Sequence, residues 1–225
     1  MTHPPGTVGI CVQETGRYTA FTESMSALQT PDDTQILWRY GSHIVNGMNW
    51  LADNFQGDWL WLMGDDHTFD PFLLMRLLDH QVDVVVPVCL MRQQPFAPVV
   101  RVDDERHVID LAKLKPSGGL VEIHSAGSAG MLIRKPVFDR VREAFPGRVF
   151  VEDGDVSEDF LFCDRVRSLG IPIHCDLGSR LGHMTATSVQ PGVAADGLFC
   201  LEFLVADSFQ IHVPLPTSLP PTNIE

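Results

Sequence analysis

The stretch LWLMGDDHTFDPFLL (60–74) joins a buried-strand pattern to a helix pattern through a short polar segment. The run WLWLM (59–63) is apolar on both alternating faces, which is typical of a parallel strand covered on both sides. After Gly64-Asp65-Asp66-His67 comes PFLLMRLLDH (71–80), whose apolar positions have helical spacing. A buried strand that leads through polar residues into a helix is the repeating unit of an α/β sheet.

The same alternation of strand and helix patterns runs through the first 90 residues. The expected strands are TVGICV (7–12), TQILWRY (34–40), WLWLM (59–63) and VDVVVPV (82–88). The expected helices are TAFTESMSALQ (19–29), HIVNGMNWLADNF (43–55) and PFLLMRLLDH (71–80). This rhythm predicts an α/β fold with a doubly wound, mostly parallel sheet, in which ligands bind beyond the carboxyl ends of the strands.

Beyond residue 90 the patterns are more mixed. The segment 99–111 suggests a small β-ribbon with an acidic turn, and 126–145 suggests a Gly-rich strand followed by a helix. A helix is expected at 157–170 and a strand at 171–177. We expect one domain over 1–213 and a Pro-rich tail over 214–225 that is extended or disordered.

The composition is that of a globular protein, with 44% hydrophobic and 20% charged residues among 225. The formal charge of −13 gives an average field that repels nucleic acid and anionic membranes. We expect no membrane span and no signal peptide. Five scattered cysteines without CxxC spacing indicate reduced thiols and a cytoplasmic location, and argue against a structural zinc site.

The polar segment after the strand at 59–63 is either a turn or a site. Asp70-Pro71 already supplies an N-cap and a first-turn proline for the next helix, so Asp65, Asp66 and His67 are not needed for capping. Two adjacent carboxylates repel each other unless a cation lies nearby. Because carboxylates and an imidazole suit a divalent ion, we interpret the segment as a metal site for Mn²⁺ or Mg²⁺.

Two later segments carry further candidates. Ser157 is suited to cap a helix whose first turn contains Glu158 and Asp159; these acids could serve the helix start alone, or one could act as a general base. His183 follows a second apolar strand pattern, and a lone histidine at such a position is more often structural than a ligand.

Taken in order, these segments resemble the GT-A fold glycosyltransferases grouped in family 2, of the kind found in bacteria and their phages. The resemblance covers roughly residues 7–185. Its motifs are NGMNWLADNFQGDWLWLMGDDH, RQQPFAPVV, SAGSAGMLIRKPVF and SEDFLFCDRVRSLGIPIHCDLGSRLGH. Asp65-Asp66-His67 stands where the family has its DXD motif, and this DXH form is similar to that of the polypeptide GalNAc-transferases.

The resemblance implies that Asp65, His67 and His183 hold a divalent ion on a nucleotide-diphosphate sugar, with Asp66 as a further ligand or sugar contact. It also implies that Asp159, with Glu158 beside it in the ED motif, deprotonates the acceptor hydroxyl in an inverting reaction. Relatives with the DXH form retain configuration, which leaves the stereochemistry open.

The remaining donor contacts expected from the resemblance are Gln13, Glu14, Arg17 and Arg39. A UDP-sugar is the expected donor, and the acceptor is left open between a glycan and a hydroxymethylated base of phage DNA, so that nucleic acid would enter only as acceptor. One alternative is a nucleotidyltransferase, for which QETGR (13–17) is a poor phosphate loop. A second alternative is a non-catalytic nucleotide- or sugar-binding domain.

Overall fold

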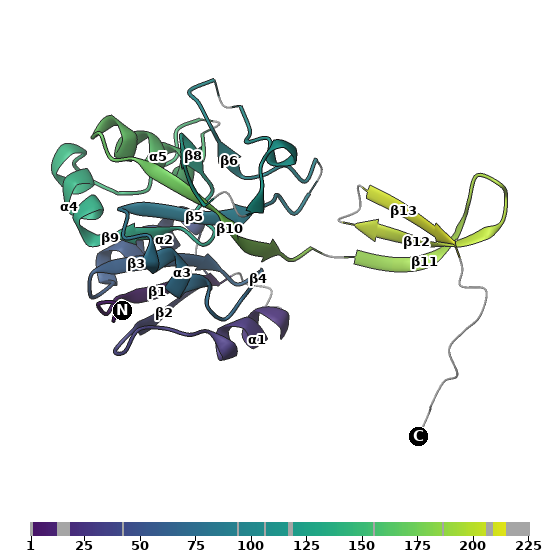
Figure 1. Ribbon diagram of the computed structural model, residues 1–225, viewed down its shortest axis with the longest axis horizontal. Coiled ribbons are helices and arrows are strands. Elements are labelled where there is room, and N and C mark those ends of the chain that lie inside the picture. Colours follow the sequence, from purple (N-terminus) through teal and green to yellow (C-terminus); the bar gives the residue numbers. More distant parts are fainter. Residues whose placement is uncertain are drawn as a thin grey trace. The chain divides into compact units, whose positions relative to one another are not determined.

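The computed structural model describes residues 2–12, 19–41, 43–93, 95–105, 107–116, 119–154, 156–185, 187–205 and 209–214. The chain divides into two compact units (Figure 1). The first unit contains Met1–Leu90 and Ala97–Met184, and the second contains Met91–Phe96 and Thr185–Glu225. The single domain expected over 1–213 stays a prediction, and 215–225 of the expected tail lie outside the described residues.

The first unit is built on an eight-stranded sheet. Its strands in spatial order are β2 (Gln35–Tyr40), β1 (Thr7–Val12), β3 (Trp59–Gly64), β9 (Leu132–Arg134), β5 (Val84–Cys89), β10 (Ile173–His183) and β4 (His67–Phe69), with β7 (Leu120–Ile123) also paired to β10. β1, β2 and β3 are parallel to one another, and so are β5 and β10. β9 lies antiparallel between β3 and β5 and joins the two parallel groups. The mostly parallel α/β sheet predicted from the sequence is confirmed.

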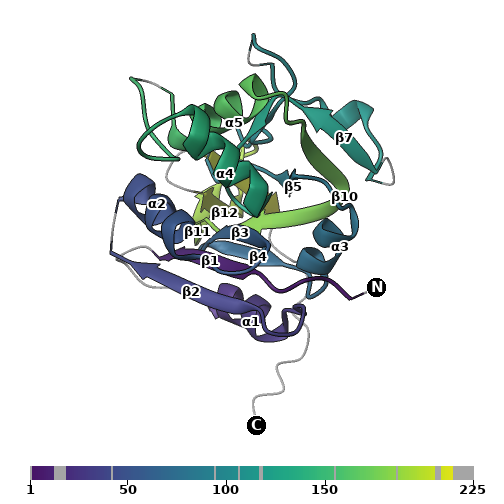
Figure 2. The same cartoon turned by 90° about the vertical axis from the view of Figure 1, so that its left-hand side faces the viewer.

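Both faces of this sheet are covered. Along β3, Trp59 and Trp61 pack into a core that also contains residues of the helices α1 (Thr19–Ala27) and α3 (Leu73–Asp79). Leu60 and Leu62 point to the other face, where the helices α2 (Ile44–Asn54), α4 (Lys135–Ala144) and α5 (Glu158–Ser168) pack. Figure 2 shows α1 and α2 on opposite sides of β1 and β2. The apolar character of both faces at 59–63 therefore reflects burial on both sides.

Three local details differ from the expectations. His67 begins the short strand β4, antiparallel to β10, where no strand was expected. α3 begins at Leu73, and Asp70 accepts a hydrogen bond from the Phe72 amide at 2.8 Å, so Asp70 closes the turn before the helix instead of capping the helix itself. The ribbon at 99–111 is reduced to one antiparallel bridge, Arg101–Val108, while β6 (Val100–Arg101) pairs with β8 (Ser125–Ala126).

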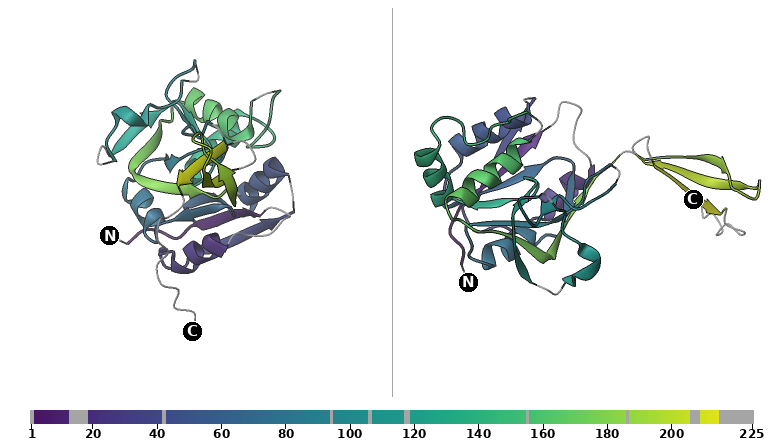
Figure 3. Two further views of the ribbon diagram at one scale, coloured as in Figure 1. Left: turned by 90° about the vertical axis from the view of Figure 1, so that its right-hand side faces the viewer. Right: turned by 90° about the horizontal axis from the view of Figure 1, so that it is seen from above.

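The second unit contains a three-stranded antiparallel sheet that the sequence patterns did not predict. Its strands are β11 (Thr187–Val193), β12 (Phe199–Val205) and β13 (Phe209–Pro214), shown side by side in Figure 3. The predicted start of the tail at Pro214 coincides with the last residue of β13. Among the residues that the structure describes, no helix combines the length and the apolar composition that a membrane crossing requires.

Candidate metal and donor site

Asp65 and Asp66 form the turn that connects β3 to β4, so the segment is both a turn and a buried cluster. Their relative exposures are 2% and 6%, and that of His67 is 4%. The turn depends on Gly64, because a Cβ atom there would lie 2.9 Å from Asp66 Oδ1 and 3.1 Å from His67 Nδ1. Buried carboxylates require compensating partners.

Histidine side chains supply the partners of Asp66. The register of β4 and β10 places His183 directly opposite His67, and the two rings stack with centroids 4.5 Å apart. Asp66 Oδ1 lies 2.9 Å from His67 Nδ1, and Asp66 Oδ2 lies 3.3 Å from His183 Nε2. The structure therefore brings together three of the residues expected at a metal site, although Asp66 and His183 are 117 positions apart in the sequence.

These contacts shift the pKa values of Asp66, His67 and His183. Burial alone would raise the pKa of Asp66, but hydrogen bonds from His183 and His67 outweigh it and hold the pKa well below its usual range. Burial opposes charge on His183 as well, yet its bonds to Asp66, Cys89 and Leu90 raise its pKa to about 10. The pKa of His67 is also raised, because its hydrogen bond to Asp66 and its proximity to Cys89 outweigh burial. A metal ion bound to His67 and His183 would displace the extra proton that the raised pKa favours on each ring, because an imidazole must be neutral to act as a ligand.

The hydrogen bonds also select which ring nitrogen is available. His183 Nδ1 lies 3.0 Å from the Leu90 carbonyl, and His67 Nδ1 lies 3.2 Å from the Gly64 carbonyl. A carbonyl accepts only from a protonated nitrogen, so these contacts leave Nε2 of each neutral ring as the ligand atom. His67 Nε2 is buried and has no hydrogen-bond partner among the described residues. The residues present thus fit a divalent transition-metal ion.

Asp65 faces a different neighbour. Burial, together with the nearby carboxylates of Glu158 and Asp65, raises the pKa of the Cys11 thiol to about 12 against the opposing effect of Arg39. Asp65 is therefore close to Cys11, at the end of β1. Its predicted role as a metal ligand stays a prediction.

Cys89 is a further side chain that could hold a metal ion, and the sequence patterns did not single it out. Ligand atoms of His67, Cys89 and His183 all lie within 4.8 Å of one another. Cys89 ends β5 as Gly64 ends β3, so its position at the carboxyl edge of a predicted strand is the signal that could have identified it.

A cavity of about 290 Å³ opens at this edge of the sheet. Its lining includes Cys11, Met48, the segment 64–67, Ser128 and Ala129. The cavity therefore joins the polar turn after β3 to the Gly-rich segment that precedes β9. Such a hollow at the carboxyl ends of parallel strands is the usual place for a ligand in an α/β sheet.

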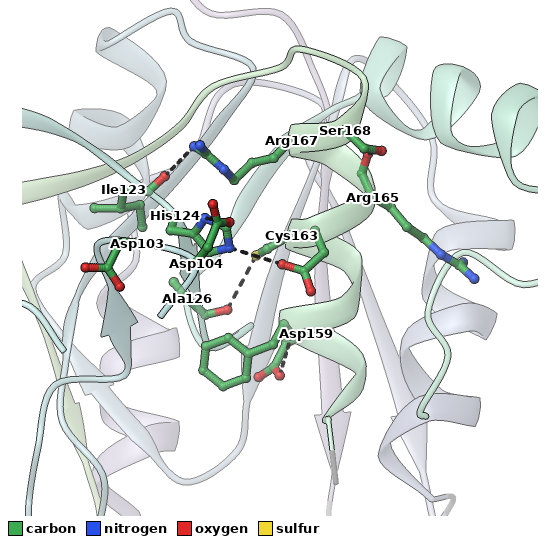
Figure 4. A network of polar contacts seen from close by, with 12 residues as sticks. Asp103, Asp104, Ile123, His124, Ala126, Asp159, Cys163, Arg165, Arg167 and Ser168 are labelled. Atoms are coloured by element: carbon green, nitrogen blue, oxygen red, sulfur yellow. Dashed lines mark hydrogen bonds and ion pairs between the residues drawn. The ribbon is translucent and has the colours of Figure 1, made fainter. Parts of the chain in front are cut away.

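Asp159 lies in the first turn of α5 (Figure 4) and contacts Ser128, which lines this cavity. Its Oδ2 accepts a hydrogen bond from the Ser128 amide at 3.2 Å, and its Oδ1 accepts one from the Phe160 amide at 2.8 Å. Ser157 occupies the N-cap position as expected, but its hydroxyl donates to Asp159 and makes no capping bond to the backbone. The expected side-chain cap is therefore wrong, because Asp159 competes for the hydroxyl.

Glu158 is 6% exposed, and its pKa is raised by burial and by the adjacent Asp159 carboxylate. Both acids of the expected ED motif are thus ordered near the cavity, with different surroundings. Whether either reacts with a substrate stays a prediction.

Arg39 lies beside Cys11 in the register of β2 and β1. Its guanidinium carbon is 5.4 Å from the centre of the Trp50 ring, and its buried Nε has no hydrogen-bond partner within the described part of the chain. Gln13, Glu14 and Arg17, expected to contact the donor, lie outside the described residues.

The sheet order, the covering helices and the small antiparallel sheets together define a GT-A-like α/β fold. No family model matches the sequence, and no curated protein matches it. Among solved structures, the chain is similar to GalNAc-T7, crystallised with UDP, GalNAc and Mn²⁺, with a TM-score of 0.55 and 10% identity over 79% of this chain and 43% of that chain. The crystal structure of A197 from STIV is similar with a TM-score of 0.50 and 12% identity, over 96% of this chain and 98% of that one. At these identities the likeness shows a shared fold.

Proposed function

We propose that this protein is a metal-dependent glycosyltransferase that moves a sugar from a UDP-sugar to an acceptor hydroxyl. The observation that carries the proposal is the convergence of Asp66, His67 and His183 at a cavity that is also lined by Ser128, whose amide donates a hydrogen bond to Asp159. The presence of UDP, GalNAc and Mn²⁺ in the structure of GalNAc-T7, which shares the fold, supports the same class of donor.

In this proposal His67 and His183 hold Mn²⁺ or Mg²⁺, with Asp66 and Asp65 as the neighbouring carboxylates. A divalent ion bound there would neutralise charge on the departing nucleoside diphosphate. It would also explain how a protein with a formal charge of −13 retains an anionic donor. Arg39, whose Nε lacks a partner among the described residues, is proposed to contact the donor, as are Gln13, Glu14 and Arg17.

Asp159 is proposed as the general base that removes the proton from the acceptor hydroxyl. Its carboxylate is oriented by the amides of Ser128 and Phe160, and this positioning is what proton transfer to a side chain requires. Glu158 is adjacent to Asp159 in the sequence, and the Asp159 carboxylate contributes to the raised pKa of Glu158. Direct attack by the activated hydroxyl would invert the configuration of the sugar. The acceptor is proposed to be a glycan or a hydroxymethylated base of phage DNA, and the location to be cytoplasmic.

Donor binding and hydrolysis test this function directly. Purified protein with Mn²⁺ is expected to bind, and slowly hydrolyse, at least one of UDP-, GDP- and TDP-sugars, and chelation by EDTA should abolish both. Failure with all three donors would contradict the proposal. Formation of a nucleotide sugar from a nucleoside triphosphate and a sugar phosphate would instead identify a nucleotidyltransferase.

Variants separate the two proposed roles. His67→Ala and His183→Ala should each weaken metal and donor binding, measured by calorimetry, because each removes an imidazole from the cluster. Asp159→Asn should leave donor binding intact and lower turnover by about 10²–10⁴-fold, the usual contribution of a general base. Equal loss of donor binding in all three variants would contradict the assigned roles.

A further inference from the structure

We infer that Cys89 is a ligand of the same metal centre, so that the centre is a sulfur-containing site that selects Zn²⁺ or Co²⁺ over Mg²⁺. The inference rests on the proposed metal site and specifies its chemistry. Nothing in the DXH resemblance includes a cysteine, and the spacing of the five cysteines in the sequence argues against a structural zinc site.

The strand register places the three side chains together. Cys89 in β5 pairs with Leu181 in β10, and His183 in β10 pairs with His67 in β4. His183 is two residues beyond Leu181 and therefore projects from the same face of the sheet, the face on which Cys89 and Leu181 share a core. The Leu90 carbonyl next to Cys89 also accepts from His183 Nδ1, which ties β5 to the imidazole.

The spacing of the ligand atoms suits one ion. Atoms of His67, Cys89 and His183 lie within 4.8 Å of one another. Bond lengths of about 2.0–2.3 Å around a tetrahedral ion place neighbouring ligands about 3.3–3.8 Å apart, so only small side-chain adjustments are needed. The fourth position would remain for Asp66 or for an oxygen of the substrate.

Two observations leave room for the ion. His67 Nε2 is buried with no hydrogen-bond partner among the described residues. Cys89 is 3% exposed, and its Sγ makes a weak contact of 3.6 Å with the Leu90 carbonyl. Thiolate and imidazole ligands favour Zn²⁺ and Co²⁺, whereas Mg²⁺ prefers oxygen ligands. The donor set therefore selects against Mg²⁺.

Cobalt spectroscopy tests this inference without using activity. Titration of the full-length, metal-free protein with Co²⁺ should produce a sulfur-to-cobalt charge-transfer band in the near ultraviolet together with the visible bands of four-coordinate Co²⁺. Zn²⁺ should displace the Co²⁺ and remove the bands, while a large excess of Mg²⁺ should not. In Cys89→Ser the charge-transfer band should be lost, and Co²⁺ should bind at least about tenfold more weakly.

Cys11→Ser is the matched control, because Cys11 lines the neighbouring cavity but lies outside the three-residue cluster. It should keep the charge-transfer band. If the wild-type protein binds Co²⁺ without showing that band, the inference that Cys89 is a ligand is wrong, and the glycosyltransferase proposal is unaffected. Loss of the band in Cys11→Ser but not in Cys89→Ser would also overturn the inference. If neither Co²⁺ nor Mn²⁺ binds, both the inference and the proposed metal-dependent function fail.

Discussion

The carboxyl groups of Asp66 and Glu158 are both buried, and their partners differ. Asp66 is compensated by two imidazoles within 3.3 Å. Glu158 has acidic neighbours instead, since the carboxylates of Asp159 and Glu152 both raise its pKa beyond the effect of burial. A buried acid surrounded by other acids lowers the stability of the folded state once it ionises.

Glu158→Gln should therefore stabilise the protein increasingly as the pH rises. The folded-state pKa of Glu158 is raised above its ordinary value of 4.5, so the unfolded chain releases this proton first. The stability of the wild type consequently falls as the pH increases from about 4.5 up to the folded-state pKa. Glu158→Gln does not lose stability in this way. Its free energy of unfolding in urea, relative to that of the wild type, should increase between about pH 4.5 and the folded-state pKa of Glu158 and then remain constant.

Glu143→Gln, which replaces an acid at an exposed position of α4, is the control for this experiment. Its stability relative to the wild type should vary little with pH. If the difference in the free energy of unfolding between Glu158→Gln and the wild type does not vary with pH, then folding does not change the pKa of Glu158.

At the scale of elements, the segment before β9 positions one wall of the cavity. Gly130 has a φ of +71°, its amide donates to the Leu62 carbonyl at 2.9 Å, and its carbonyl accepts from the Trp61 indole at 2.9 Å. A Cβ atom at this position would lie 2.7 Å from Pro87 Cγ. The segment is therefore clamped between β3 and β5.

Gly130→Ala should destabilise the protein by more than the left-handed backbone conformation alone explains. Gly170 has the same φ of +71°, but a Cβ atom there would have no neighbour within 4 Å among the described residues, so Gly170→Ala isolates the backbone effect, about 1–2 kcal/mol. In thermal or urea unfolding, the Gly130 variant should lose roughly 1–3 kcal/mol more, the usual cost of overpacking. Equal losses would show that the neighbourhood of Pro87 relaxes freely.

The elements that the sequence predicted correctly are those with local patterns. The strand at 59–63 and the helix at 43–55 are recognisable because their own residues show which faces are buried. β4 has only three residues and is defined by its distant partner β10, so no local periodicity reveals it. The resemblance singled out His67 and His183. Cys89 lies at the carboxyl edge of a predicted strand, but only the pairing of β5 with β10 brings it next to His183.

At the scale of the whole first unit, the residues of the proposed metal site lie on three strands, which a bound ion would connect. His67, Cys89 and His183 come from β4, β5 and β10. An ion bound to all three would cross-link these strands in the folded state only, since the unfolded chain has no preformed site. Binding should consequently be coupled to unfolding of this unit.

Metal addition should therefore raise the midpoint of thermal unfolding. At a free metal concentration about 100 times Kd, the free energy of unfolding should increase by about 2.7 kcal/mol, and EDTA should reverse the change. His67→Ala should unfold at a midpoint that metal does not alter. An equal metal-induced shift in this variant would place the binding site elsewhere in the protein.

The long sequence separation of Asp66 and His183 also has a consequence for synthesis on the ribosome. A nascent chain that has just emerged through β5 already contains Asp66, His67 and Cys89, but β10, which places His183 against them, follows only after α5. Until β10 docks, the carboxylate at Asp66 lacks one of its two imidazole partners and the edge of β5 that pairs with β10 is unpaired. If the proposed site binds a metal, the order of translation would delay its capture until the sheet of the first unit is nearly complete.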